Sequence, residues 1–490
     1  MKNKYIIVFV LTVLLFSCTD NFEDYNTDKK NPEAVAGEML FSNAQKELSD
    51  QLSSTSVNQN VFKLWAQYWT ETQYTEESNY NIVKRTQPDW KFRVYYRQIL
   101  TDLQESKKLI AQAVPLTEEE RFENANKIEI IEMLTVFAYQ NLVDIFGMVP
   151  YSEALDIDNL YPAYDDGLTI YRDLIVRLDA AIAGMDATHG SFSATEDFYY
   201  HGNVNAWIKF ANTLKIKLAI NLSDVDLTLA GATITSALAG EGVFTSSIDD
   251  ATMTYKSAVP NTNPLYVDIV LSGRDDFVPA NTLIDTMNAL NDPRRAQYFT
   301  LHDTSSVNGV EKLAYVGGRF GYTNSYLNYS HINPNIYKAE APGLILTYTE
   351  LLFYLAEAAE RGFTVPLSAE EYYNDGIVSS FDFWGATDVA TYLANPDVAY
   401  STAPGTWKEK ICLQSWLAFY TRGDVAWNTY RRLDGLKMNI PRRPKTLDGL
   451  PPRRFTFPIQ EQSLNKGKYD LAAEAVGGDF LETRIFWDLQ

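Results

Sequence analysis

Two clusters of tyrosine, asparagine and arginine side chains carry the clearest chemical signal in this sequence. The first lies between Trp69 and Trp90, where one predicted helix ends and the next begins, and it contains Tyr74, Asn79 and Tyr80. An aromatic ring with a polar tip can stack on the C–H face of a sugar, and an amide can hydrogen-bond to its hydroxyls. The two tryptophans are better explained by packing at the helix ends. We therefore expect Tyr74, Asn79 and Tyr80 to contact a ligand.

The second cluster lies within residues 317–337, where tyrosines recur among Gly, Asn and Ser residues. Its candidates for ligand binding are Arg319, Tyr322, Tyr326 and Tyr329, because arginine and tyrosine together suit the hydroxyls and ring faces of sugars. The same composition also fits a tyrosine-rich hairpin packed on the helices or against a partner protein. Both interpretations remain open from the sequence.

Motifs for catalysis, metal binding and cofactor binding are absent from the sequence. The four histidines are scattered without the spacing of a zinc site, and there is no phosphate-binding loop or nucleophile elbow. With 63 acidic residues, carboxylate pairs occur at any separation, so no glycosidase pair can be assigned. Asp156 and Asp158 resemble the start of a calcium loop whose later ligands are missing. We expect no catalytic residue, no metal site and no cofactor.

The composition indicates an acidic protein with a large core. The chain has 490 residues, 46% of them hydrophobic, and its formal net charge is −21. Such a charge argues against nucleic acid as a partner and against direct adhesion to an anionic lipid surface. Of the two cysteines, Cys412 is expected to be a buried thiol, and Cys18 ends the first hydrophobic segment.

The N-terminus has the pattern of a secretory signal peptide over residues 1–17. Two lysines precede twelve largely apolar residues, which as a helix would span about 18 Å, short of the roughly 30 Å of a bilayer core. Residues 15–18 resemble a lipobox, although Phe16 is larger than usual, and predict lipidation at Cys18. Residues 18–31 then form an acidic tether. An ordinary cleaved signal with Cys18 incidental is the alternative.

Helical periodicity dominates the body and predicts an all-α fold of tetratricopeptide-like helix pairs. Thr347 and Glu350 form a capping box before an apolar face, and Gly362 suits the left-handed position after that helix. Short breaks between helices favour helical hairpins, although no strict 34-residue repeat is found. Six other helices are predicted, over residues 32–52, 57–74, 89–113, 126–146, 168–183 and 204–222.

Two stretches lack sustained periodicity within this single domain over residues 32–490, and a third is rich in proline. Residues 242–338 form an irregular insertion rich in Asn, Pro, Gly and Tyr, and residues 386–414 are similarly mixed. Residues 422–490 contain several prolines and are expected to be mostly loop. Long irregular segments in compact proteins are commonly functional.

Six short segments spread along the chain occur in an order that resembles one known family. They are residues 26–32, 141–154, 207–212, 291–294, 347–358 and 453–465. Together with the lipoprotein-like start, they make the chain similar to the SusD/RagB family, and in particular to its SusD-like branch of outer-membrane sugar uptake.

This resemblance implies an all-α body of tetratricopeptide-like helix pairs with a loop-rich subdomain packed over one face. It also implies a cell-surface lipoprotein, held at the outer membrane by its lipid alone, that binds oligosaccharides or, in some members, peptides. The implied partner is a SusC-like, TonB-dependent outer-membrane transporter. The family has no catalytic residues, and its ligand-binding side chains vary, so none can be carried over to this chain.

Two other classes of protein remain open. One is a surface-anchored helical glycoside hydrolase or lyase, which product analysis beside binding measurements would reveal. The other is a purely structural scaffold of helix repeats, which would associate with a barrel without binding a ligand.

Overall fold

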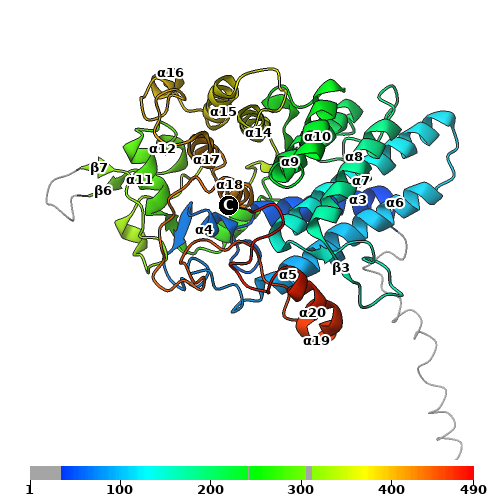
Figure 1. The fold of residues 1–490 in the computed structure, drawn as a ribbon, viewed down its shortest axis with the longest axis horizontal. Helices are drawn as coiled ribbons and strands as arrows, with labels where there is room; N and C mark the ends of the chain where they lie inside the picture. The colour runs from blue at the N-terminus through cyan, green and yellow to red at the C-terminus, as the bar shows by residue number, and fades with distance from the viewer. Residues whose placement is uncertain (1–34, 241, 305–311, 490) are drawn as a thin grey trace, which may run out of the picture.

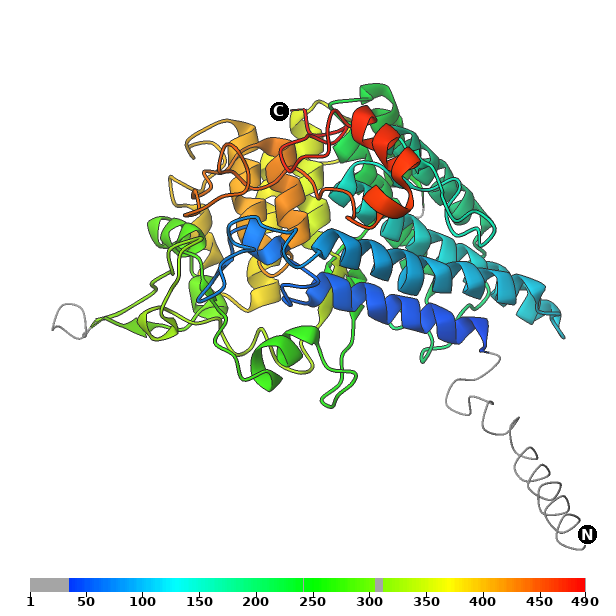
Figure 2. The same cartoon turned by 90° about the horizontal axis from the view of Figure 1, so that it is seen from below.

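Long helices packed side by side form the body of the molecule, and two views show the arrangement (Figure 1, Figure 2). The computed structural model describes residues 35–240, 242–304 and 312–489. The predicted signal peptide, Cys18 and the acidic tether lie outside the described residues. Within these ranges, no helix has both the length and the apolar composition needed to cross a membrane.

In the first half of the chain, long helices pack against their neighbours in sequence. Three of them begin at a side-chain cap, because Thr117, Asp166 and Asn203 each accept a hydrogen bond from the N–H three residues further on. Gly147, with φ of 84°, follows the longest helix and ends it. The helices are α3 (Gly37–Ser53), α6 (Thr101–Gln112), α7 (Glu118–Phe146), α8 (Gly167–Gly184), α9 (Val204–Leu222) and α10 (Leu227–Ala239).

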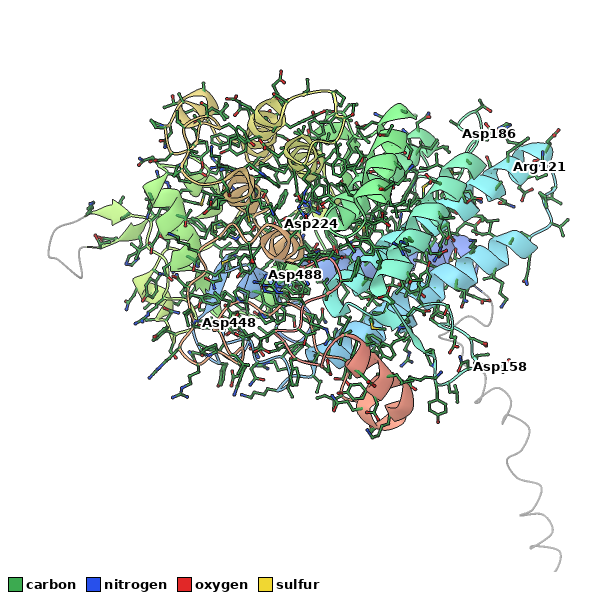
Figure 3. The ribbon with its side chains drawn as sticks, in the orientation of Figure 1. Arg121, Asp158, Asp186, Asp224, Asp448 and Asp488 are labelled. Atoms are coloured by element: carbon green, nitrogen blue, oxygen red, sulfur yellow. The ribbon has the colours of Figure 1, made fainter. Side chains whose placement is uncertain are left out.

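In the second half, too, helices pack against their neighbours in sequence. The two halves meet where α14 contacts α9. Arg121 and Asp186 mark the far end of the α7–α8 hairpin, whereas Asp488 lies near the middle of the view in Figure 3 and is fully buried. The helices of this half are α14 (Tyr348–Glu360), α15 (Ala369–Trp384), α16 (Val389–Leu393), α17 (Trp407–Ala418) and α18 (Gly423–Leu433).

The predicted capping box at the start of α14 is half correct. Thr347 Oγ1 accepts from the Glu350 N–H at 3.3 Å, as expected. The Glu350 carboxylate, however, lies 3.0 Å from Lys217 Nζ and 2.7 Å from Arg422 Nη2. Two buried cations thus hold this carboxylate, so it joins α9, α14 and the start of α18.

The irregular insertion contains short elements that pair with distant parts of the chain. Strand β5 (Phe277–Pro279) pairs antiparallel with β1 (Trp69–Glu71), and β4 (Ala251–Met253) pairs with β8 (Gly343–Leu346). These ladders dock the insertion onto the helical body. Its other elements are η3 (Tyr266–Leu271), α11 (Asn281–Ala289), α12 (Arg295–Tyr298), β6 (His302–Asp303), β7 (Leu313–Ala314) and η4 (Tyr326–Asn328).

Some predicted boundaries are wrong. The helix expected over residues 57–74 is only α4 (Phe62–Trp65), because Gln67 adopts φ of 55° and the chain then enters β1. Residues 422–490 contain α18 as well as two further helices, so this segment is less irregular than predicted. The remaining elements are α5 (Gln87–Val94), η1 (Tyr95–Leu100), β2 (Val149–Pro150), β3 (Tyr164–Asp165), α19 (Glu461–Leu464) and α20 (Lys466–Ala475).

Candidate ligand-binding site

A cavity of about 820 Å³ lies where the β1–β5 ladder meets η3. Its size falls within the range of about 300–1,000 Å³ that is typical of small-ligand pockets. Three segments distant in sequence form its walls: residues 55–58 after α3, residues 71–74 with Arg85, and residues 267–277. The tertiary pairing of β1 with β5 therefore creates the cavity.

Backbone and side-chain hydrogen bonds hold these walls together. Thr72 donates from its N–H to Asp276 O at 2.9 Å and from its hydroxyl to Asp275 O at 2.6 Å. Across the cavity, one carboxylate oxygen of Asp268 accepts from the N–H groups of Thr55 and Ser56, at 2.9 and 3.0 Å. Both walls are thus fixed before any ligand arrives.

The rim presents one exposed aromatic ring beside several polar groups. Tyr74 is 71% exposed, with φ of 53°, and its neighbour Gln73 is also exposed. Opposite them, Arg274 lies 3.8 Å from Asp276. A ring for stacking, with amide, guanidinium and carboxylate groups for hydroxyls, is the chemistry that a sugar requires.

The inner wall contains a buried carboxyl group, Glu71, which is 3% exposed. Burial, and then the charge of neighbouring Glu77, raise the pKa of Glu71 well above its usual value. Its Oε2 accepts from the Ser78 N–H at 2.9 Å, while Glu77 Oε1 accepts from Arg85 Nε at 2.8 Å. The surroundings of Glu71 therefore favour the neutral form of this carboxyl group.

Of the first predicted cluster, only Tyr74 reaches the cavity. Tyr80 is fully buried, and its hydroxyl accepts from Gln67 Nε2 at 3.1 Å. Asn79 is 6% exposed, and its amide donates to Thr75 O and to Gly321 O. The loop turns the side chains of Tyr80 and Asn79 into the interior, so neither lines the cavity, and their contact with a ligand stays a prediction.

The second cluster lies beside the cavity without lining it. Asn324 N donates to Thr72 O at 3.0 Å, which places this loop on the other side of the segment that forms the cavity wall. The Arg319 guanidinium covers the Tyr322 ring at 3.7 Å from its centroid. The ring of Tyr326 stacks on His331. Tyr329 is half-buried, so this cluster offers less free ring surface than expected.

Little in the sequence predicts that η3 and the Arg274–Asp276 turn line a cavity. The charges of this turn are typical of a solvated surface loop, and its residues are indeed largely exposed. The only available signal was the apolar run of residues 266–271 next to it, which leaves Val267 and Leu271 exposed at 42% and 52%. Exposed apolar side chains beside a charged turn are a cue to a binding surface.

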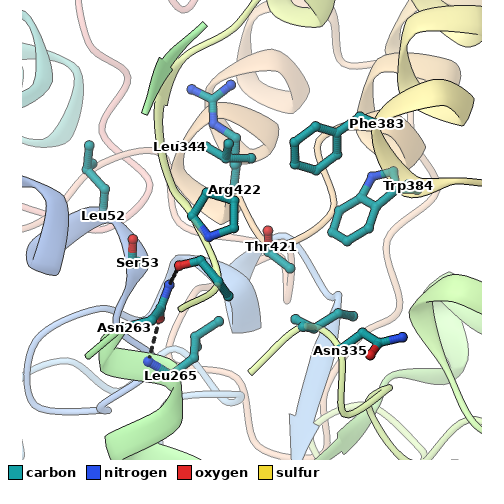
Figure 4. Close-up of a pocket in the computed structure, with 13 residues that line it drawn as sticks. Leu52, Ser53, Asn263, Leu265, Asn335, Leu344, Phe383, Trp384, Thr421 and Arg422 are labelled. Atoms are coloured by element: carbon teal, nitrogen blue, oxygen red, sulfur yellow. Dashed lines mark hydrogen bonds between the residues drawn. The ribbon is translucent and has the colours of Figure 1, made fainter. Parts of the chain in front are cut away.

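A second cavity, between α15 and the segment before α14, is too small for a sugar ring. It measures about 80 Å³, well below the usual size of ligand pockets. Figure 4 shows Phe383 and Trp384 on one side of it and Arg422 at its edge. Asn263 already donates to Ala341 O at 2.8 Å within it. We assign the candidate site to the cavity of about 820 Å³, because it combines this volume with the exposed ring of Tyr74 and several polar groups at its rim.

Comparison with known proteins gives a family match over most of the chain. Residues 29–458 match the SusD-like model described as "Starch-binding associating with outer membrane". No curated protein sequence matches the chain.

Solved structures share the fold over nearly their whole length. A SusD homologue from Bacteroides uniformis is 26% identical, covering 92% of this chain and 99% of its own, with a TM-score of 0.76. A chitin-binding protein is 24% identical over 93% of this chain and 100% of its own, with a TM-score of 0.77. A chitin-binding SusD homologue from Flavobacterium johnsoniae is 22% identical over 92% and 97%, with a TM-score of 0.72. These likenesses confirm the predicted fold class of tetratricopeptide-like helix pairs.

Proposed function

Because the chain belongs to the SusD-like family of starch-binding proteins associated with the outer membrane, we propose that it captures oligosaccharides at the cell surface and delivers them to a SusC-like, TonB-dependent transporter. The observation that carries this proposal is the cavity of about 820 Å³ with the exposed ring of Tyr74 at its rim. Two structural neighbours are named as chitin-binding proteins, so chitin oligosaccharides are the first ligands to test, with starch oligosaccharides beside them.

The cavity suits a saccharide better than an apolar ligand. Its rim exposes polar groups from Gln73, Arg274 and Asp276 together with the Tyr74 ring. Each of these groups can exchange hydrogen bonds with water for hydrogen bonds with sugar hydroxyls, so polar atoms are not left unpaired when a sugar binds. Capture therefore needs no covalent step.

Lipidation at Cys18 is the remaining part of this proposal. A lipid on this residue would hold the body at the outer face of the membrane, and the acidic residues that follow would give a solvated tether. The family's association with the outer membrane supports this location.

Replacement of Tyr74 by Ala tests the site. We expect Tyr74→Ala to weaken oligosaccharide binding by about 1–3 kcal/mol, because a stacked ring is lost, while thermal stability stays unchanged. Isothermal titration with chitin and starch oligosaccharides measures the affinity. Tyr161→Ala is the matched control, since Tyr161 is also well exposed (59%) but lies outside the cavity. Equal affinity of wild type and Tyr74→Ala would remove the cavity from the proposal.

Product analysis on the same samples separates binding from catalysis. Within the cavity, the raised pKa of Glu71 favours a hydrolase, because a protonated carboxyl group can act as a general acid. We expect the oligosaccharides to be recovered intact. Shortened products that disappear in Glu71→Gln would instead establish a glycosidase, and association with a barrel without ligand binding would indicate a scaffold.

A further inference from the structure

Four exposed cations gather on one surface of this acidic protein. They come from two loops, one before η4 and one after α18, and we call them the basic patch: Arg319, Arg442, Arg443 and Lys445. The chain as a whole carries a formal charge of −21, so the local charge of this patch is opposite in sign to the net charge of the molecule.

One aromatic ring brings two of these guanidinium groups together. Arg319 Cζ lies 3.7 Å from the centroid of the Tyr322 ring, and Arg442 Cζ lies 5.8 Å from the same centroid. The two loops touch closely, because a Cβ on Gly321 would lie 2.2 Å from Pro441 Cβ. Cation–π contact with a shared ring offsets part of the repulsion between the two charges.

Buried Asn79 fixes the rest of the patch. Its Oδ1 accepts from the Arg443 N–H at 2.6 Å, and its backbone carbonyl accepts from the Lys445 N–H at 2.9 Å. Its side-chain amide donates to Gly321 O at 3.0 Å. Asn79 thus holds both loops of the patch in register, which fixes the backbone from which the four cations extend.

The four cations have no ion-pair partner within the described residues, unlike the cations next to them. Arg85 Nε lies 2.8 Å from Glu77, and Lys84 is paired with Glu76. The nearby carboxylates of Asp448 and Glu482 accept from backbone N–H groups of residues 450 and 447. Cations that extend from a fixed backbone and have no protein counter-charge are a typical binding surface for an anion.

The patch adjoins the cavity across one residue. Thr72 accepts from Asn324 N on the patch side and donates to Asp276 O on the cavity side. Asp275 and Asp276 in the cavity wall disfavour acidic groups inside it, whereas the patch favours them just outside. A saccharide chain that extends past Tyr74 would therefore meet carboxylates first and free cations next.

We propose that the basic patch binds the acidic groups, carboxylate or sulfate, of a glycan chain whose neutral residues occupy the cavity. This inference rests on the proposed function and narrows its ligand to acidic heteroglycans. The attraction between the basic patch and these acidic groups contributes to the affinity, and this contribution falls as the ionic strength rises.

Affinity measurements on the full-length chain test the patch. The probes are hyaluronan oligosaccharides, which alternate carboxylated and neutral units, keratan sulfate oligosaccharides, which combine sulfated and neutral units, neutral chitin and starch oligosaccharides, and polyglutamate as an acidic polypeptide. We expect Arg442→Gln/Arg443→Gln to weaken binding of one of the acidic saccharides about tenfold at low salt, with neutral oligosaccharides unaffected. Arg97→Gln/Lys256→Gln is the matched control, because it removes two exposed positive charges elsewhere.

The outcomes separate this inference from the proposed function. Equal loss of affinity in both double variants, or none in either, would overturn the patch. Binding of neutral oligosaccharides without any preference for acidic ones would overturn it while the proposed function stands. Tighter binding of polyglutamate than of either acidic saccharide would assign the patch to an acidic protein instead. Failure of every saccharide to bind would remove the proposed function as well.

Discussion

Glu350 is fully buried, and two cations from other elements surround its carboxylate. Burial alone would raise the pKa of Glu350, but the charges of Arg422 and Lys217 and a hydrogen bond from Tyr354 outweigh it and lower the pKa to about 2. Tyr354 lies one turn further along α14, whereas Lys217 comes from α9 and Arg422 directly precedes α18. The ion pairs of Glu350 therefore link α14 to α9 and to the start of α18.

Removal of this carboxylate should destabilise the protein strongly. We expect Glu350→Ala to lower the free energy of unfolding by about 3–5 kcal/mol, because Lys217 and Arg422 are left buried without a counter-charge. Urea unfolding at neutral pH measures the loss. Glu340→Ala is the control, since Glu340 is exposed and its removal should change stability by less than about 0.5 kcal/mol.

The pH dependence of the same variant has a definite sign. The folded pKa of Glu350 lies below its ordinary value of 4.5. The carboxylate's contribution is therefore fully present above pH 4.5 and is lost as the pH falls toward 2. Glu350→Ala should lose less stability than wild type over this window, and equal acid sensitivity of the two proteins would contradict the assignment.

Close helix packing depends on glycine at the α14–α15 contact. A Cβ on Gly376 would lie 2.9 Å from the Phe353 ring, which is itself 2% exposed. Helix α15 therefore keeps a residue of poor helix propensity because α14 leaves no room for a side chain. Packing between elements overrides the local preference.

Two glycine-to-alanine variants separate packing from propensity. We expect Gly376→Ala to destabilise the protein by about 1–3 kcal/mol, because overpacking against Phe353 exceeds the gain in helix propensity. Gly467→Ala in α20 should instead stabilise by about 0.4–1 kcal/mol, since nothing lies within 4 Å of its new methyl group. Thermal unfolding of both variants measures the difference, and the same sign in both would refute the packing argument.

At the scale of the whole molecule, the two helical halves form the body and the docked insertion forms part of the cavity wall. The halves meet at α9 and α14, while the insertion reaches back to β1 and builds the cavity (Figure 1). The views agree that α6 to α10 form one side of the body and that α11, α12 and α15 to α17 form the other (Figure 1, Figure 2). The loop that follows β1 contributes to both sites, because its Tyr74 lines the cavity and its Asn79 holds the loops of the basic patch.

Removal of the proposed lipid should release the whole molecule from the membrane. We expect Cys18→Ala to move the protein from the membrane fraction to the soluble fraction, because each buried CH₂ of an acyl chain contributes about 0.8 kcal/mol of membrane affinity. Cys412→Ala is the matched control, since Cys412 is buried and should leave fractionation unchanged. Immunoblots of the separated fractions provide the measurement. Retention of Cys18→Ala in membranes would contradict lipid anchoring at this residue.

Local sequence determined much of the helical framework. Residues 204–222 were predicted as a helix with the bounds that α9 has, and residues 168–183 agree with α8 within one residue at each end. Periodicity and caps act over a few residues, so one chain segment contains the information. The family resemblance likewise rests on short segments in order, and the match over residues 29–458 bears it out.

Only tertiary structure decided which aromatic rings face a ligand. Tyr74 and Tyr80 are six residues apart in one polar loop, both with positive φ, yet one is 71% exposed and the other is fully buried. The difference comes from contacts with residues hundreds of positions away, such as Gln67 with Asn439 and Thr72 with Asp276. Strand pairing and burial depend on which distant segments meet, and no local pattern encodes that meeting.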